Sequence, residues 1–500
     1  MRFPRTAGVL LHPTSLPGRH GIGDLGDEAY EMIDFLARSR QTLWQVLPLG
    51  PTGYGDSPYQ CFSAFAGNPL LISPGHLVRD GFLPAETLSQ TPDFPLHRVD
   101  YGPVIVHKRE LLSQAYAHFR TYGTAIQRDA FDEFCAEHQA WLGDYALFMA
   151  LKMHHMHHLG GVWNTWPQDI AFRADEALRK WSQRLADQVM QHKFQQFLFF
   201  QQWLRLKAYA NERSIRIIGD MPIFVAFDSA DVWARQELFH LRDDGEPSVV
   251  AGVPPDYFSQ TGQRWGNPLY RWERMAQDSY GWWAARLQMA LTQVDIIRLD
   301  HFRGFEAYWE IPAEEATAVI GRWVKGPGAY FLQAMNETLG SLPIIAEDLG
   351  VITPEVVELR DRFGFPGMKI LQFAFGGERN SSFLPHNFDH NSVVYTGTHD
   401  NDTTVSWYQS ARLEERDHLR RYLGRDATDV AWDLIRLAYS SVSDIAVATM
   451  QDLMKLGNEA RMNYPSRLGG NWQWRYLPGM LTDSIASFLA EITELYGRTP

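Results

Sequence analysis

The chain has 500 residues, of which 45% are apolar and 21% charged, and its net charge is −13. This composition is typical of a soluble globular protein, and the acidic balance argues against a nucleic acid or an anionic membrane surface as a partner. No apolar run reaches the roughly 18 residues of a membrane-spanning helix, and the first apolar run is too short for a signal peptide.

Eight short apolar runs recur along the chain, and each is followed by polar residues or by Gly and Pro. Such runs predict buried strands, and helical periodicity between most of them favours a (β/α)8 barrel over an open doubly wound sheet. The predicted strands are residues 8–16, 42–49, 216–224, 294–302, 343–349, 368–375, 392–398 and 444–450. The predicted helices include residues 26–37, 194–211, 329–340, 353–363, 430–440 and 482–496.

The spacing of the strands is uneven, whereas a plain barrel needs only about 250 residues. The second and third strands enclose an inserted subdomain at about 51–210, with predicted helices at 108–121 and 128–156. A second insert lies at about 226–290, between the third and fourth strands. We expect an α/β fold in which residues 1–500 form one TIM barrel domain with large helical and loop insertions. The last strand leaves no room for a C-terminal β-sandwich domain.

Charged side chains gather at the predicted C-terminal ends of four strands, where barrel enzymes place their catalytic groups. In chain order they are Asp220; Arg298, Asp300 and His301; Glu347 and Asp348; and His399, Asp400 and Asp402. Ionised groups at the mouth of a buried strand are costly unless they pair or do chemistry. Each alone could be a cap, a loop anchor or a structural histidine, but their coincidence at one mouth indicates an active site.

Two close carboxyl groups, one ionised and one protonated, are what a retaining reaction at a glycosidic bond requires. Asp300 is the candidate nucleophile, because Arg298 two residues earlier lies on the same strand face and is expected to lower its pKa. Glu347 suits the acid if a partly apolar, carboxylate-rich pocket raises its pKa. A third carboxylate can hold sugar hydroxyls and stabilise the positive charge of the transition state.

Six segments carry a resemblance to a known family: residues 53–60 (GYGDSPYQ), 219–224 (GDMPIF), 228–233 (DSADVW), 298–304 (RLDHFRG), 346–350 (AEDLG) and 396–403 (TGTHDNDT). In these motifs and their order, the chain resembles the amylomaltases, compact bacterial 4-α-glucanotransferases of the α-amylase superfamily. The resemblance implies that Asp300 is the nucleophile, Glu347 the acid/base and Asp400 the transition-state stabiliser.

A transferase must let a sugar hydroxyl compete with water, so its site must hold an acceptor and exclude solvent. In the family a loop of the second insert reaches over the active site, so its aromatic residues are either stacking platforms or loop packing. The expected substrate-binding residues are Tyr54, Asp56, Asp220, Tyr257, Phe258, Trp265, Arg298, His301, His399 and Asn471.

Two further features of the sequence could form sites. His154 and His158 have the spacing of a metal-binding pair, but without a nearby acidic or Cys partner they are interpreted as a solvated helix face, and no metal is expected. Cys61 and Cys135 could form one disulfide, but two free thiols of a cytoplasmic protein are favoured. Neither a phosphate-binding loop nor a metal cluster is present in the sequence, so we expect no cofactor.

The predicted function is therefore transfer of a 1,4-α-D-glucan segment to the 4-hydroxyl of an acceptor glucose or maltodextrin, through a covalent glycosyl-enzyme intermediate. The expected partners are maltooligosaccharides and other 1,4-α-glucans, with no nucleic acid, no membrane and no obligatory protein partner. A plain α-glucan hydrolase is the alternative within the superfamily. A catalytically silent glycogen- or starch-binding barrel is the alternative from another class, although the three carboxylates and Arg298 speak against it.

Overall fold

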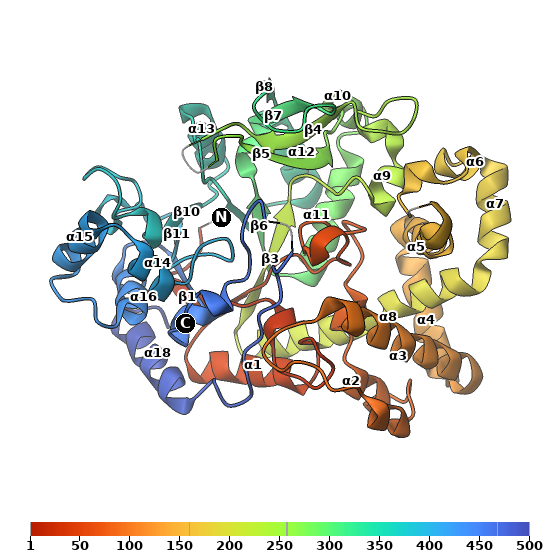
Figure 1. Ribbon diagram of the computed structural model, residues 1–500, viewed down its shortest axis with the longest axis horizontal. Coiled ribbons are helices and arrows are strands. Elements are labelled where there is room, and N and C mark those ends of the chain that lie inside the picture. Colours follow the sequence, from red (N-terminus) through yellow and green to blue (C-terminus); the bar gives the residue numbers. More distant parts are fainter. Residues whose placement is uncertain (1, 160, 257–258, 468, 500) are drawn as a thin grey trace.

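The computed structural model describes residues 2–159, 161–256, 259–467 and 469–499, leaving out the side chains of 157–159. Eight parallel strands form one sheet in the order β10-β11-β12-β1-β2-β3-β6-β9 (Figure 1). Their bounds are β1 (Thr6–Leu10), β2 (Leu43–Gln45), β3 (Arg216–Pro222), β6 (Ile296–Asp300), β9 (Ile344–Ala346), β10 (Gly367–Ile370), β11 (Ser392–Tyr395) and β12 (Ile445–Thr449). This order follows the chain around a ring, as the predicted barrel requires.

The ring closes between β9 and β10 through irregular hydrogen bonds. The Ala346 N–H donates to the Pro366 carbonyl at 2.9 Å, and the Met368 N–H donates to the Asp348 carboxylate at 2.8 Å. Inside the ring, one apolar cluster draws buried residues from all eight strands: Leu10, Leu43, Ile218, Ile296, Ile345, Ile370, Val393 and Ile445 among them. The barrel interior is thus a packed core, as in other (β/α)8 proteins, and the predicted fold class is confirmed.

Several strands end earlier than the apolar runs predicted. β2 stops at Gln45, although Val46, Leu47 and Leu49 are also buried. The Leu11 N–H still donates to the Gln45 carbonyl at 3.0 Å, after β1 has ended. Apolar residues therefore continue into buried loops above the barrel, which is why apolar character alone overestimates strand length.

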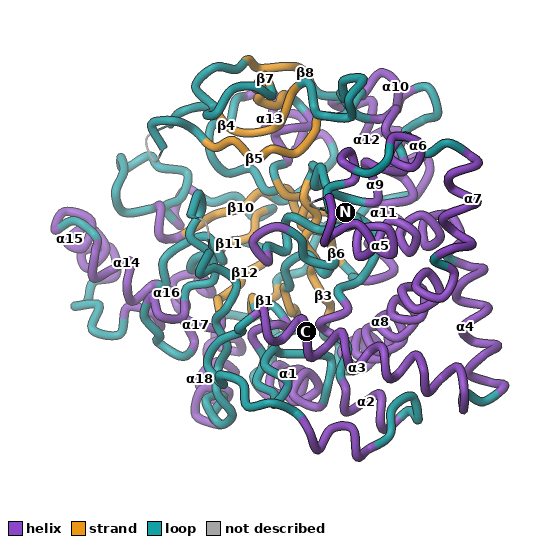
Figure 2. Tube along the Cα trace, turned by 45° about the vertical axis from the view of Figure 1, so that its right-hand side comes forward, coloured by secondary structure: helices purple, strands orange, loops and turns teal. Residues whose placement is uncertain are grey.

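Helices surround the barrel strands, which lie near the centre of the molecule in Figure 2. Those between or after the barrel strands are α1 (Asp27–Arg38), α8 (Ala186–Glu212), α11 (Gly281–Gln293), α12 (Gly328–Leu339), α13 (Pro354–Arg362), α14 (Thr404–Ser410), α15 (Leu413–Leu423), α16 (Val430–Ser440), α17 (Met450–Leu453) and α18 (Asp483–Leu495). In the described part of the chain, no helix is both long and apolar enough to cross a membrane.

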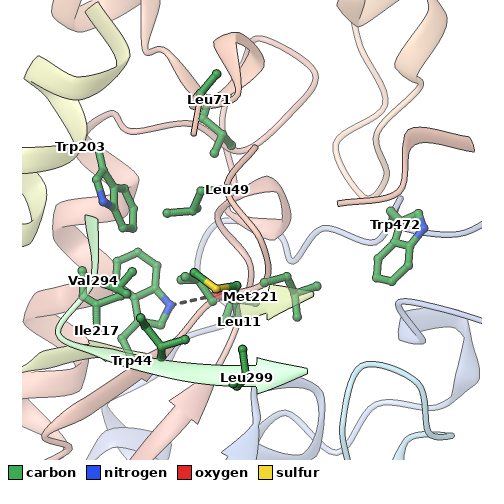
Figure 3. Packing of buried hydrophobic residues seen from close by; sticks show 14 of the residues in the cluster. Leu11, Trp44, Leu49, Leu71, Trp203, Ile217, Met221, Val294, Leu299 and Trp472 are labelled. Carbon is green, nitrogen blue, oxygen red and sulfur yellow. Dashed lines mark hydrogen bonds between the residues drawn. The ribbon is translucent and has the colours of Figure 1, made fainter. Parts of the chain in front are cut away.

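Large aromatic side chains fill the space between barrel and helices. Trp44 of β2 and Trp203 of α8 are fully buried, with ring centroids 6.4 Å apart. The Trp44 Nε1–H donates to the Leu11 carbonyl at 2.9 Å, the dashed line in Figure 3. Such rings bury large apolar areas while the indole N–H keeps a partner, so they anchor β2 against its covering helix.

The segment between β2 and β3 is helical, as the sequence predicts. Its helices before α8 are α2 (Pro74–Arg79), α3 (Tyr101–Tyr122), α4 (Ala125–Glu137), α5 (Gln139–Leu159), α6 (Gln168–Ala171) and α7 (Asp175–Arg184). They lie to the right and below the barrel in Figure 1.

The segment between β3 and β6 holds strands that the sequence analysis did not predict. Its elements before α11 are α9 (Ala230–Ala234), β4 (Val249–Val253), β5 (Gln263–Pro268) and α10 (Trp272–Ala276). Together with β7 (Ala307–Pro312) and β8 (Arg322–Lys325), these strands form an antiparallel sheet in the order β5-β4-β7-β8, at the top of Figure 1. Because β7 and β8 follow β6, the sheet combines segments from both sides of a barrel strand.

Candidate active site

Arg298 is a buried residue of β6, and Asp300 is the last residue of that strand and partly exposed. Arg298 Nη1 donates to Asp300 Oδ1 at 3.0 Å and to both carboxylate oxygens of Asp220, at 2.7 and 2.6 Å. The exposed fraction of the side chain is 6% for Arg298, 0% for Asp220 and 27% for Asp300. Asp300 is therefore the member of this cluster that faces the mouth.

The protonation of Asp300 differs from the prediction. Burial raises its pKa to about 6, although Arg298 acts in the opposite direction. Arg298 lowers the pKa of Asp300 as expected, but burial is the larger effect and the net shift is upward. The negative charge of Asp220, which contacts the same guanidinium, also raises the pKa of Asp300.

Glu347 follows β9 and is held by backbone amides. Its Oε2 accepts from the His301 N–H at 2.7 Å and its Oε1 from the Leu349 N–H at 2.9 Å. Burial and the charge of Asp300 raise the pKa of Glu347 to about 7, as the sequence analysis expected. Because Arg298 donates a hydrogen bond to Asp300 while neutral amides hold Glu347, the first proton of the pair leaves Asp300.

The backbone turns at His301, directly after β6. Its φ of 53° lies in the left-handed region, which is uncommon for a residue with a side chain. The turn aims its N–H at Glu347 and its ring at Trp265 of β5, with ring centroids 4.8 Å apart and nearly perpendicular planes. The small sheet thus delivers one predicted aromatic residue to the catalytic strand end.

His399 and Asp400 come together after β11. His399 Nε2 lies 3.3 Å from Asp400 Oδ2, and the Asn463 Nδ2–H donates to Asp400 Oδ1 at 2.6 Å. Burial alone would raise the pKa of Asp400, but the attraction of His399 and these contacts outweigh it and lower the pKa to about 2. Asp400 therefore stays ionised across the whole range in which Asp300 and Glu347 titrate.

Tyr59 joins these groups, although the sequence analysis did not single it out. Its hydroxyl donates to Asp220 Oδ2 at 2.7 Å and lies 2.9 Å from His399 Nε2. Its ring stacks on the His399 ring, with centroids 5.2 Å apart and planes inclined by 19°. Trp472 was also missed, and its ring lies 5.9 Å from both. Tyr59 lies within the 53–60 motif, but nothing in that motif distinguishes it from Tyr54.

The other predicted contacts differ in how exposed they are. Tyr54 is 73% exposed in a 3₁₀ turn, Tyr54–Asp56, and burial raises the pKa of the half-buried Asp56. Asn471 is buried, and its amide bonds the backbone of Tyr464 and Arg467 at 3.0 and 2.9 Å.

Of the predicted substrate-binding residues, Tyr257 and Phe258 lie outside the part of the chain that the structure describes. Asp220 faces Arg298 and Tyr59 rather than the mouth, so in this conformation it supports residues that line the site. A contact between Asp220 and a sugar stays a prediction.

Among the residues that the structure describes, no group of three or more His, Cys, Asp and Glu side chains is placed to hold a metal ion. The His158 side chain lies outside that set, so the His154–His158 pair stays untested. Cys61 and Cys135 are free thiols. The described residues bring three carboxyl groups to the mouth, those of Asp300, Glu347 and Asp400, together with the guanidinium of Arg298.

Comparisons with known proteins agree with this geometry. Residues 11–481 match a family described as 4-alpha-glucanotransferase. The 4-alpha-glucanotransferases of Synechocystis sp. and Thermus thermophilus are each 53% identical to this chain, covering 99% and 100% of it and 98% and 100% of their own lengths. An amylomaltase from Streptococcus agalactiae in complex with acarbose superposes with a TM-score of 0.95 at 40% identity, covering 99% of this chain and 100% of its own. The chain therefore belongs to the 4-alpha-glucanotransferase family, and it is an enzyme of that class.

Proposed function

We propose that this enzyme transfers a segment of a 1,4-α-D-glucan to the 4-hydroxyl of an acceptor glucose or maltodextrin by a retaining double displacement. The observation that supports the mechanism is that Asp300 and Glu347 have different partners at the mouth. Asp300 accepts a hydrogen bond from the guanidinium of Arg298 at 3.0 Å, whereas Glu347 accepts from the backbone N–H groups of His301 and Leu349 at 2.7 and 2.9 Å. The cation favours the ionised form of Asp300, the nucleophile, whereas burial and the charge of Asp300 raise the pKa of Glu347, the proton donor.

In the first step a carboxylate oxygen of Asp300 attacks the anomeric carbon, and the bond from that carbon to the leaving O4 breaks. Glu347 gives its proton to that oxygen, so the leaving chain departs as a neutral alcohol. In the second step the 4-hydroxyl of the acceptor attacks the same carbon, returns its proton to Glu347 and releases Asp300. Asp400 stabilises the positive charge that develops on the sugar ring.

The substrate class rests on the relatives. The similar chains are named 4-alpha-glucanotransferases, and the solved amylomaltase holds acarbose. We propose maltooligosaccharides and other 1,4-α-glucans as substrates of this enzyme. The proposed sugar contacts are the ten residues given above, with Tyr59 behind His399 and Arg298.

Organisation and location are proposals of the same kind. We propose one catalytic domain over residues 1–500, with inserted subdomains at about 51–210 and 226–290. Tyr59 and Trp265, one from each insert, adjoin the catalytic cluster, which supports this division. The two free thiols fit a cytoplasmic enzyme. No cofactor and no obligatory protein partner are proposed.

Incubation with pure maltotriose tests the function. Transfer yields glucose together with a ladder of longer chains, whereas hydrolysis yields only shorter ones and a binding protein leaves maltotriose intact. We expect the ladder from the wild type and no products from Asp300→Asn. The exposed substitution Asp426→Asn is the matched control and should leave the ladder unchanged. Absence of a ladder from the wild type would overturn the transferase proposal.

A further inference from the structure

Asp400 and its neighbour His399 lie in the segment between β11 and α14, residues 396–403, which is called loop 396–403 below. These residues form neither a helix nor a strand. A carboxylate that stabilises charge in a transition state must be held to within about 0.5 Å. Because the loop has no regular hydrogen bonds of its own, its shape depends on contacts with other parts of the chain.

Both ends of the loop are bound by one carboxylate, that of Asp452. Asp452 Oδ2 accepts from the Thr396 hydroxyl at 2.6 Å and from the Thr404 hydroxyl at 2.8 Å. Its Oδ1 accepts from the Thr404 N–H at 2.8 Å. Thr396 is the first residue of the loop, and Thr404, which begins α14, directly follows its last. One side chain thereby joins the two ends of the segment that carries Asp400.

Asp452 is itself fixed in place. It lies in α17, directly after β12, where Thr449 Oγ1 accepts from the Asp452 N–H at 3.2 Å. Asp452, Thr396 and Thr404 are all buried. Burial raises the pKa of Asp452, whereas the hydrogen bonds from the two threonines lower it, so these bonds favour the ionised form. A buried carboxylate is costly unless its oxygens are hydrogen-bonded, so Asp452 and its donors hold one another in position.

The chain that follows Asp452 also contacts the middle of the loop. The Asn463 N–H donates to the His399 carbonyl at 3.1 Å, and Arg461 Nη2 donates to the Asp400 carbonyl at 2.6 Å. These contacts hold the backbone beside the carboxylate, whereas Asp452 holds the two ends of the loop. The loop is therefore supported along its length by the segment that follows β12.

We propose that Asp452 is a positioning residue for Asp400: by joining the two ends of loop 396–403, it sets where the Asp400 carboxylate meets the sugar ring. This inference rests on the proposed role of Asp400 as the stabiliser of the transition state. Loss of the Asp452 carboxylate would release both ends of the loop, and Asp400 would shift relative to Asp300 and Glu347. Asp452 acts only through the loop and takes no part in bond exchange.

A double-mutant cycle in kcat/KM, measured as fluoride release from maltosyl fluoride, tests this inference. Asp452→Ala should lower kcat/KM about 100-fold, the cost of a displacement of about 1 Å at a catalytic group. In the Asp400→Asn background the same change should cause little further loss, because the group that Asp452 positions is already gone. Asp444→Ala is the matched control: it removes a buried carboxylate that pairs with Arg2 directly before β12. It should leave kcat/KM unchanged in both backgrounds.

Two changes at Thr404 repeat the comparison from the donor side, so the test does not depend on one variant folding. Thr404→Val keeps the branched shape but removes the hydroxyl that donates to Asp452. It should lower kcat/KM roughly 10-fold, as expected for one hydrogen bond to a charged group, and again cause little further loss in the Asp400→Asn background. Thr404→Ser keeps the hydroxyl and should stay close to the wild type.

Undiminished kcat/KM in Asp452→Ala, or in Thr404→Val where Asp452→Ala does not fold, would overturn the inference. Equal fold-losses in the wild-type and Asp400→Asn backgrounds would also overturn it, because they would indicate a general structural role. Both results would leave the proposed function intact. If Asp400→Asn is itself as active as the wild type, the proposed role of Asp400 fails together with this inference.

Discussion

Arg298 contacts two carboxylates, and this division governs the chemistry of the site. Arg298 Nη1 donates to both carboxylate oxygens of Asp220, at 2.7 and 2.6 Å, and to Asp300 Oδ1 at 3.0 Å. Burial raises the pKa of Asp300 more than Arg298 lowers it, and the charge of Asp220 adds to the rise. Burial and the charge of Asp300 raise the pKa of Glu347. At the residue scale, the two carboxyl groups differ in their partners. Asp300 contacts the guanidinium of Arg298, whereas Glu347 accepts hydrogen bonds from two backbone N–H groups.

The first prediction concerns pH. Below about pH 6 Asp300 binds its proton, and above about pH 7 Glu347 loses its own. Transfer should therefore show a bell-shaped kcat/KM profile with a narrow maximum between those limbs. Glu347→Gln, assayed on an activated donor such as maltosyl fluoride, should lose the alkaline limb and keep the acidic one. An alkaline limb that persists would assign it to another group.

The same shifts affect stability. A carboxyl group whose pKa is higher in the folded than in the unfolded state stabilises the fold while protonated, and this contribution is lost as the pH rises through the folded value. Glu347→Gln should therefore raise the free energy of unfolding at pH 8 relative to the wild type, with little change at pH 5. Denaturant titrations at both pH values measure this difference.

Tyr59 gives a second prediction at this scale. Tyr59→Phe removes the hydroxyl that joins Asp220 and His399 but keeps the stacked ring. A hydrogen bond to a charged group contributes about 1.5–3 kcal/mol. Its loss should lower kcat/KM for maltotriose by up to roughly 10- to 100-fold and lower the melting temperature by a few degrees at most. Tyr122→Phe, at an exposed position, is the matched control. Undiminished activity of Tyr59→Phe would remove it from the site.

At the scale of elements, the loops and the small sheet finish the mouth that the strands begin. β6 ends in Asp300, and β9 and β11 lead to Glu347 and Asp400, the proposed catalytic carboxylates. The β5 strand, an edge of the antiparallel sheet, carries Trp265 to His301. The sheet thereby packs one indole against His301, the residue that follows β6.

Trp265→Ala tests this role of the sheet. Removing the indole opens the region beside His301, so water should compete better with the acceptor hydroxyl. We expect the ratio of released reducing ends to transfer products from maltotriose to rise several-fold. Trp323→Ala, on the opposite edge strand β8, is the control and should leave the ratio unchanged. Equal ratios in all three proteins would contradict a solvent-excluding role for Trp265.

At the scale of the whole molecule, the packed interior of the barrel holds together the strands whose C-terminal ends form the site. All eight strands contribute to one packed interior, and Trp44 and Trp203 fix β2 against α8 on the outside. Trp44→Ala should lower the free energy of unfolding by about 3–5 kcal/mol, as is usual for the loss of a large buried aromatic residue. Chemical denaturation measures it, with the partly exposed Trp323→Ala as the reference. A cost below about 1 kcal/mol would contradict the packing described for Trp44.

The barrel and its strand-end charges could be predicted because parallel strands buried on both faces are continuous apolar runs, and charge marks where each run ends. The small sheet could not, because β4 contains Gly252 and its partner β7 lies beyond β6 in the chain. Tyr59 was missed because its position depends on how a long loop folds back over the mouth. The net rise in the pKa of Asp300 could not be predicted, because the sequence shows the neighbouring cation but neither the burial that outweighs it nor the contact of Asp220 with the same guanidinium.

The most direct test of the account is to trap the covalent intermediate. Glu347→Gln, incubated with maltosyl fluoride, should still form the glycosyl-enzyme, since fluoride departs without acid assistance, but should be slow to release it. Mass spectrometry of the digested protein should then find a maltosyl adduct on the peptide that contains Asp300, and none in the Asp300→Asn, Glu347→Gln double variant. An adduct on another carboxylate, or inverted configuration at the anomeric carbon of the product, would contradict the assignment of Asp300 as nucleophile.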